Sequence, residues 1–320
     1  MNWGMTWMHE GLLRRFQAGD RAALARVISL LEDRSAGHAA LLQSLYPMTG
    51  SASVIGITGA PGVGKSSLVA ALADHLRDDA TVAVLAIDPS SPMTGGAILG
   101  DRIRMPAANS DDRIYVRSMS ARGQQGGLAV ATGAALTALD AFGFDRIIIE
   151  TVGAGQSEVD IVSAADTTVV VTQPSSGDHI QLMKAGIVEI ADIFVLNKAD
   201  QPGADTAMLD LEALVQQRAG SDGWTPPVCE TVATAPQGLK RLTEAIAAHD
   251  ARVQTDVDTL DGARRRTIAT VGWIIAAELA ETAAACTKRL RGDPALVDAI
   301  HNGDRDLYTT AEILMEGQEP

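Results

Sequence analysis

The chain has only two cysteines, Cys229 and Cys286, among its 320 residues. So few thiols exclude a disulfide-rich scaffold, and no CxxC pair or Cys/His cluster has the spacing of a structural zinc site. Unpaired cysteines are typical of a reducing compartment. The cysteine content therefore predicts a cytoplasmic protein.

Aromatic residues and positive charge are also scarce. Aromatic residues make up 3% of the chain although hydrophobic residues make up 46%, so the core must be built from Ala, Val, Ile and Leu. Lys and Arg number 26 against 40 Asp and Glu, which leaves a net charge of −14. A field of this sign argues against nucleic acid or an anionic membrane as a partner. It still allows a small local phosphate site.

Long apolar runs and a leader sequence are missing as well. No run reaches the roughly 18 apolar residues of a membrane helix; the best candidate, residues 268–279, is short and contains Glu278. The first residues, MNWGMTWMHEGLLRRF, lack the basic and then apolar pattern of a secretory signal. We therefore expect neither secretion nor membrane insertion.

What is present is an alternation of short apolar runs with helical periodicity. Apolar spacing predicts helices between residues 10 and 45, with Asp20 as an N-cap. Strands are then predicted at 54–58, 81–87, 146–150, 167–172, 193–196 and 228–231, and helices at 67–76, 128–139 and 206–219. This pattern predicts an α/β fold, a mostly parallel sheet with helices on both faces. We expect a helical extension at 1–47, the α/β domain at 48–250 and a helical arm at 251–320.

A phosphate-binding loop follows the first predicted strand. Residues 59–66 match GxxxxGK[ST] in full: Gly59, Ala60, Pro61, Gly62, Val63, Gly64, Lys65 and Ser66, with Ser67 next in the predicted helix. Glycines let backbone N–H groups curl around phosphates, the lysine reaches the outer phosphates, and the serine hydroxyl binds magnesium. The dipole of the following helix favours the same anion. The sequence therefore predicts a P-loop nucleotide site.

The base is indicated by Asn197, Lys198 and Asp200 in the sequence NKAD, which follows the strand predicted at 193–196. An Asp carboxylate can accept hydrogen bonds from the N1–H and N2 amine of guanine, and adenine offers no equivalent pair. Asn197 would face the other base edge or brace the loop, while the Lys198 stem would cover the ring. A third contact is predicted from backbone N–H groups at Val232 and Ala233.

Acidic residues at strand ends complete the chemistry. Asp88 and Glu150 each end a predicted strand at the sheet edge that carries the phosphate loop, where a carboxylate can hold magnesium directly or through water. Gly153, three residues after Glu150, is placed to offer its N–H to a γ-phosphate. Helix capping or turn hydrogen bonding is the alternative role for the two carboxylates.

Together the segments DPSSPMTGGAILGDRIRM, ETVGAGQSEVD and NKAD and the phosphate loop resemble the MeaB/ArgK-type GTPases, relatives of human methylmalonic aciduria type A protein, over about residues 10–290. The resemblance implies a SIMIBI-class P-loop fold that hydrolyses GTP to GDP with Mg²⁺. It also implies a homodimer formed through the C-terminal arm. The implied partner is an adenosylcobalamin-dependent acyl-CoA mutase, whose cofactor loading the GTPase gates and which it protects; an adenosyltransferase is a further implied partner.

Site residues also follow from the resemblance. It assigns Ser66, Asp88, Asp101 and Glu150 to the magnesium shell. It places Gln156 in a second switch segment, where it is a candidate to orient water, and Asp178 and Lys184 in a third loop that signals to the mutase. That loop reads GDHIQLMK where the family usually has GDxxQGIK, so it lacks a flexible glycine.

We expect slow intrinsic hydrolysis that a partner accelerates. Lys65 and magnesium would take the developing phosphate charge, with Glu150 at the metal and Gly153 at the γ-phosphate. Two alternatives stay open. A nickel-insertion metallochaperone GTPase shares the fold, but it should show His-rich or Cys ligand tracts. A small-molecule kinase could use the same phosphate loop, although NKAD argues against it.

Overall fold

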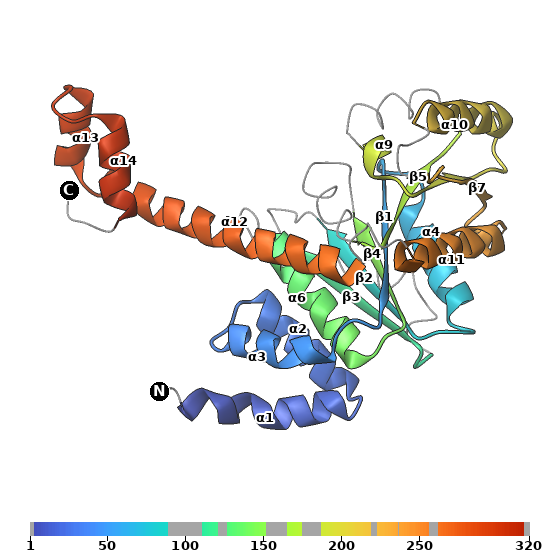
Figure 1. Cartoon of the computed structure of the whole chain (residues 1–320), viewed down its shortest axis with the longest axis horizontal. Helices are drawn as coiled ribbons and strands as arrows, with labels where there is room; N and C mark the ends of the chain where they lie inside the picture. Colours follow the sequence, from blue (N-terminus) through green and yellow to red (C-terminus); the bar gives the residue numbers. More distant parts are fainter. Residues whose placement is uncertain are drawn as a thin grey trace.

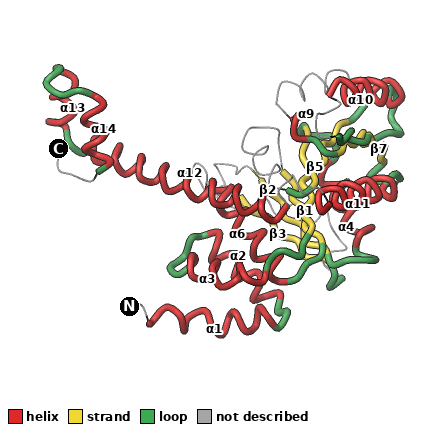
Figure 2. Tube along the Cα trace, in the orientation of Figure 1, coloured by secondary structure: helices red, strands yellow, loops and turns green. Residues whose placement is uncertain are grey.

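The computed structural model shows an α/β body from which one long helix projects (Figure 1). The structure describes residues 3–88, 111–120, 127–151, 165–174, 187–218, 223–235, 237–255 and 262–316. Strands gather in the centre of the body and helices surround them (Figure 2). The predicted α/β class is therefore confirmed.

A single parallel sheet forms the body, with the strand order β3-β2-β4-β1-β5-β6-β7. Its strands are β1 (Ser53–Gly59), β2 (Val82–Asp88), β3 (Ile114–Ser120), β4 (Arg146–Thr151), β5 (Thr167–Thr172), β6 (Ile193–Asn197) and β7 (Val228–Thr231). The central strands are buried along nearly their whole length, as their runs of Val and Ile require of strands covered on both faces. Six of these strands lie where the sequence predicts them.

The strand that the prediction missed is β3, at the edge of the sheet beside β2. Its sequence, IYVRSMS, lacks the continuous Val and Ile run of the central strands and is interrupted by Arg117. The Arg117 guanidinium is paired with Glu32 at 2.6 Å. Because Glu32 belongs to a helix 85 residues earlier in the chain, no local pattern indicates that this arginine is accommodated.

Helices cover both faces of the sheet. On one face α4 (Lys65–Leu76) and α11 (Leu239–Thr255) pack on β1, β5 and β6 in one hydrophobic cluster. On the other face α6 (Gly127–Phe142) covers β4, while α10 (Ala204–Arg218) packs with β6 and the short helix α9 (Ile187–Ile190) lies near β5. The core is aliphatic, as the shortage of aromatic residues predicts.

Of the N-terminal helices, α2 (Arg21–Glu32) and α3 (His38–Leu45) pack against α6, and α1 (Trp3–Gln17) packs on α2 (Figure 1). A 3₁₀ turn, η1 (Tyr46–Met48), leads from them toward β1. Asp20 is the N-cap of α2, as predicted, and its carboxylate accepts from the N–H groups of Ala22 and Ala23.

The C-terminal part consists of α12 (Gly262–Arg291), which carries α13 (Pro294–His301) and α14 (Leu307–Met315) at its far end, away from the sheet (Figure 1). Polar contacts tie α12 to the body both at its root and beyond its middle. Arg266 donates to both carboxylate oxygens of Asp166 at 2.5 Å, and Arg34 forms ion pairs with Glu278 and Glu281.

By length and composition alone, the segment Arg264–Arg291 of α12 could span a membrane, since an 18-residue window of it has a mean hydropathy of 1.4. Only 6% of that window is buried inside the chain. Mean hydropathy tolerates isolated charges such as Glu278, which is why the helix meets this criterion although it contains no uninterrupted apolar run of that length.

Candidate functional site

The predicted nucleotide-binding motifs meet at the carboxyl edge of the sheet. The phosphate loop follows β1, Glu150 lies near the end of β4, and Asn197 ends β6. In parallel sheets ligands bind at this edge, next to the strand at which the strand order reverses, so that later strands are added on its other side. Here that strand is β1, with β4 on one side and β5 on the other.

The phosphate loop runs from Gly59, the last residue of β1, to Lys65, the first of α4. Gly59 and Gly64 both have positive φ, at 144° and 94°. A Cβ on Gly59 would lie 2.2 Å from the carbonyl oxygen of Val171, and one on Gly64 would lie 2.5 Å from Nδ2 of Asn197. Both positions thus require glycine for conformation and for space.

Lys65 is buried at the start of α4, with only 6% of its surface exposed. Its Nζ donates to the carbonyl oxygens of Gly59 at 2.8 Å and Ala60 at 3.0 Å. Burial lowers the pKa of Lys65 from its usual value, and the negative charge of Glu150 acts in the opposite direction. The Lys65 ammonium is therefore held inside the loop by two carbonyl oxygens. An anionic ligand could take the place of either as the hydrogen-bond acceptor.

Ser66 and Glu150 are in direct contact. Ser66 Oγ donates to Oε1 of Glu150 at 2.5 Å, and Glu150 is 2% exposed. A hydroxyl and a carboxylate are oxygen donors of the kind that Mg²⁺ prefers, so these two residues fit a magnesium site. Asp88 ends β2 at the same sheet edge, and Asp101 lies outside the described residues. Among the described residues, no group of three or more His, Cys, Asp or Glu side chains forms a metal cluster.

Asn197 connects three segments of the chain. Its Nδ2 donates to the carbonyl oxygen of Val63 in the phosphate loop at 2.9 Å. Its Oδ1 accepts from Thr231 Oγ1 at 3.1 Å and from the Ala233 N–H at 3.2 Å. Asn197 thus braces the phosphate loop against the segment that follows β7, and its contact with a base stays a prediction.

Lys198 reaches in a different direction. Its Nζ donates to the carbonyl oxygen of Gly62 at 2.7 Å and to Oε1 of Gln173 at 2.6 Å. Sequence reasoning did not single out Gln173 or Thr231. The available signal for both was a polar residue at the carboxyl end of a buried strand, since Gln173 directly follows β5 and Thr231 ends β7.

Asp200 lies on the surface at the rim of this edge, three residues beyond the end of β6. Nearby, the N–H of Val232 donates to the carbonyl oxygen of Gln237, and the N–H of Ala233 is engaged by Asn197. Contacts from Val232 and Ala233 to a base stay a prediction. The predicted Gly153, Gln156, Asp178 and Lys184 lie outside the described residues.

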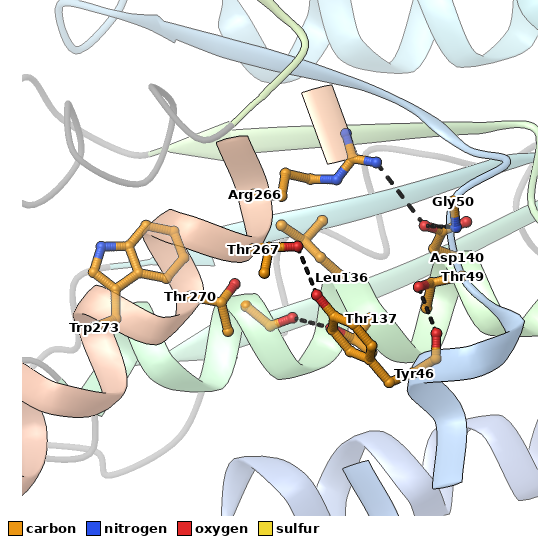
Figure 3. Close-up of a pocket in the computed structure, with 11 residues that line it drawn as sticks. Tyr46, Thr49, Gly50, Leu136, Thr137, Asp140, Arg266, Thr267, Thr270 and Trp273 are labelled. Atoms are coloured by element: carbon orange, nitrogen blue, oxygen red, sulfur yellow. Dashed lines mark hydrogen bonds and ion pairs between the residues drawn. The ribbon is translucent and has the colours of Figure 1, made fainter. Parts of the chain in front are cut away.

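A pocket of about 280 Å³ lies elsewhere, between α6, η1 and the root of α12 (Figure 3). The buried Asp140 forms part of its wall and accepts from the N–H groups of Gly50, Ser51 and Ala52 at 2.8 to 3.1 Å. Across it, Tyr46 and Thr267 are hydrogen-bonded through their hydroxyls at 2.6 Å. Asp140 thus fixes the loop before β1 to α6, and the Tyr46–Thr267 bond joins η1 to α12.

Comparisons with known proteins agree on one family. The family model of the methylmalonyl-CoA mutase-associated GTPase MeaB matches residues 24–288. A protein of Pyrococcus horikoshii that carries the name "Putative GTPase" is 43% identical over 95% of this chain and 96% of its own length. The mitochondrial methylmalonic aciduria type A homolog of Caenorhabditis briggsae is 38% identical over 68% of this chain and 58% of its own. A solved structure of a LAO/AO transport system kinase matches with a TM-score of 0.68 and 25% identity over 96% of both chains.

Proposed function

Because the chain belongs to the MeaB family of methylmalonyl-CoA mutase-associated GTPases, and is thus a P-loop GTPase, we propose that its GTP cycle gates cofactor loading of an adenosylcobalamin-dependent acyl-CoA mutase and protects that enzyme. The observation that carries the GTP site is the contact between the two loops, in which Asn197 and Lys198 bind carbonyls of Val63 and Gly62. The phosphate loop and the NKAD loop are therefore in direct contact, which supports one nucleotide site shared by both.

Each residue of the site has a distinct part in this proposal. Asp200 reads the guanine edge, and the N–H groups of the phosphate loop hold the phosphates. Lys65 exchanges its two loop carbonyls for phosphate oxygens, which places a positive charge where hydrolysis develops negative charge. Ser66 and Glu150 would hold Mg²⁺, which, when bound, neutralises charge on the outer phosphates.

Nucleotide choice gives the first test. The purified protein, stripped of nucleotide, is titrated with fluorescent GDP and ADP in the presence of Mg²⁺. We expect GDP to bind at least about 100-fold more tightly, because a base lacking the guanine edge leaves the Asp200 carboxylate without its partners. Tight ADP binding without GDP binding would refute the GTP site and favour the kinase.

The partner is tested with purified mutases. Methylmalonyl-CoA mutase and related acyl-CoA mutases are added singly, and GTP turnover and mutase inactivation are followed together. We expect slow turnover alone and faster turnover with one mutase, whose inactivation also slows. Turnover on the order of 10 per second without a partner, or no response to any mutase, would contradict the proposed role. An adenosyltransferase is proposed as a third component and is tested in the same assay.

We also propose that the chain is a homodimer assembled through α12. Four apolar side chains on this helix are 49 to 60% exposed, namely Ile268, Val271, Ile275 and Leu279. Their spacing places them on one face, opposite the face of Arg266, Thr270 and Trp273 that points into the pocket (Figure 3). A row of exposed large apolar residues is typical of an interface.

The dimer is tested by light scattering on two matched variants. Ile275→Glu places a charge in the centre of the row, and Ala280→Glu places it on the same helix outside the row. We expect the wild-type protein and Ala280→Glu to be dimers and Ile275→Glu to be a monomer. A wild-type monomer, or a dimer that Ile275→Glu leaves intact, would exclude this interface.

The nickel-insertion alternative finds no support in the described residues, which contain no candidate ligand cluster. The proposed location is the cytoplasm. The proposed organisation places a helical extension at 1–47, the GTPase domain at 48–250 and the dimerisation arm at 251–320. Packing of the N-terminal helices on α6 and projection of α12 from the body support the two extensions.

A further inference from the structure

We propose that Gln173 is a positioning residue for guanine nucleotides, because its side-chain carbonyl fixes the Lys198 ammonium against the phosphate loop. The inference rests on the proposed guanine site. It assigns a role to the residue that directly follows β5, a strand that carries no nucleotide motif of its own.

The first observation is the geometry around Lys198. Its Nζ lies 2.6 Å from Oε1 of Gln173 and 2.7 Å from the carbonyl oxygen of Gly62. An ammonium can only donate, so the amide of Gln173 must present its oxygen to it. One cation thus links the carboxyl end of β5 to the phosphate loop.

The second observation is the backbone of Lys198, whose φ is +58°. This left-handed conformation is unfavourable for a residue with a Cβ and persists only where the surroundings impose it. Two hydrogen bonds hold the peptide unit that follows it: the carbonyl oxygen of Lys198 accepts from the Gln201 N–H at 2.9 Å, and the Ala199 N–H donates to the carbonyl oxygen of Thr231 at 3.1 Å. The side chain therefore leaves a fixed backbone, and Gln173 fixes its far end.

The third observation is the charge of the partners. Both acceptors of the Lys198 ammonium are neutral, one amide and one backbone carbonyl. A neutral acceptor orients the cation without cancelling its charge, whereas a carboxylate would do both. Gln173 therefore holds the Lys198 stem where it can lie along a base while its positive charge stays available beside the phosphate loop.

The test is a double-mutant cycle on nucleotide affinity. Gln173→Met keeps the length of the side chain and removes the acceptor, and Lys198→Met removes the cation. Dissociation constants and dissociation rates of fluorescent GDP and GTP are measured for both single variants and for the double variant. Gln216→Met, at an exposed position on α10, is the matched control.

We expect Gln173→Met to weaken GDP and GTP about tenfold each, mainly through faster dissociation, since a hydrogen bond to a charged group is lost. Combined with Lys198→Met, the same change should alter affinity less than twofold, because the partner is already gone. Gln216→Met should bind as the wild-type protein does. Gln173→Ala serves as a second variant without the acceptor. Urea unfolding of every variant shows whether a weaker affinity is caused by a less stable fold.

Two results would overturn the inference. One is GDP affinity of Gln173→Met within twofold of the wild type. The other is an equal loss in both backgrounds, which would show that Gln173 acts without Lys198. If the wild-type protein binds no GDP, the proposed guanine site is refuted. If it binds GDP but the cycle shows no coupling between Gln173 and Lys198, only the proposed role of Gln173 is refuted.

Discussion

Ser66 Oγ donates a 2.5 Å hydrogen bond to Oε1 of Glu150, which joins the first turn of α4 to the end of β4. The contact brings together two oxygen donors that are 84 residues apart in the chain. Both belong to the proposed magnesium site. Substitution of Ser66 by Ala removes only one hydroxyl, so Ser66 is the residue at which the site is tested.

Ser66→Ala should abolish most of the gain in GTP affinity that magnesium provides, because the metal loses an oxygen ligand. We expect the ratio of GTP dissociation constants in EDTA and in Mg²⁺ to fall at least about tenfold. Ser66→Thr keeps the hydroxyl, as the motif allows, and should preserve the ratio. A magnesium effect of wild-type size in Ser66→Ala would remove this residue from the metal site.

Asp200→Asn should change the preferred nucleotide base of the protein from guanine to xanthine. The change replaces an acceptor with a donor at the base edge, so guanine loses its partner and the second carbonyl of xanthine gains one. We expect GDP affinity to fall about 100-fold and XDP affinity to rise, as measured by competition with a fluorescent nucleotide. Asp205→Asn, five residues on at the exposed start of α10, should change neither. Unchanged GDP binding would place the base elsewhere.

Asn197→Ala should affect stability as well as binding, unlike Asp200→Asn. Asn197 is 1% exposed, and its amide satisfies three groups: the Val63 carbonyl, the Thr231 hydroxyl and the Ala233 N–H. Leaving these groups without a partner should lower the free energy of unfolding by about 2–4 kcal/mol. Urea unfolding of the nucleotide-free protein measures this, with the exposed Asn302→Ala as control. Stability equal to that of the control would contradict the bracing role.

Lys65 should make the nucleotide-free protein more stable at alkaline pH. Its pKa is lowered by burial, so between that value and the usual one near 10.5 the unfolded chain binds more protons than the folded protein does. The free energy of unfolding therefore rises with pH across that window, by about 1.4 kcal/mol for each unit by which the pKa is lowered. Lys65→Met should lack this rise.

The measurement is urea unfolding of both proteins at several pH values from 7 up to about 10.5. The difference in stability between Lys65→Met and the wild type should shift in favour of the wild type as the pH increases. Equal slopes for the two proteins would show that Lys65 is not desolvated in the fold.

The sheet and the phosphate loop could be predicted because their signals are local. Runs of Val and Ile mark strands that are buried on both faces, and the loop from Gly59 to Ser66 has a composition that phosphate binding requires. The edge strand β3 escaped because Arg117 interrupts its pattern, and the partner of Arg117 is Glu32 of α2. A contact between residues so far apart in the chain produces no periodic pattern in the sequence around either of them.

The candidate site divides in the same way. Residue types and strand ends predict Ser66, Glu150 and Asn197 as site residues, but they could not show that Asn197 braces the phosphate loop. That contact is with Val63, which lies 134 residues earlier in the chain. Gln173 was missed because a glutamine after a strand becomes informative only once Lys198 is seen beside it.

Strand β1 carries the phosphate loop at its carboxyl end. At its amino end the N–H of Val54 donates to the carboxylate of Asp166, which also accepts from Arg266 of α12. Its seven residues span roughly 23 Å and are hydrogen-bonded to β4 and β5 along both edges. The strand therefore forms a rigid connection between the phosphate loop and the root of α12. A partner bound to α12 would be held at a fixed distance and angle from the phosphate loop, because a sheet strand and not a flexible linker separates the two.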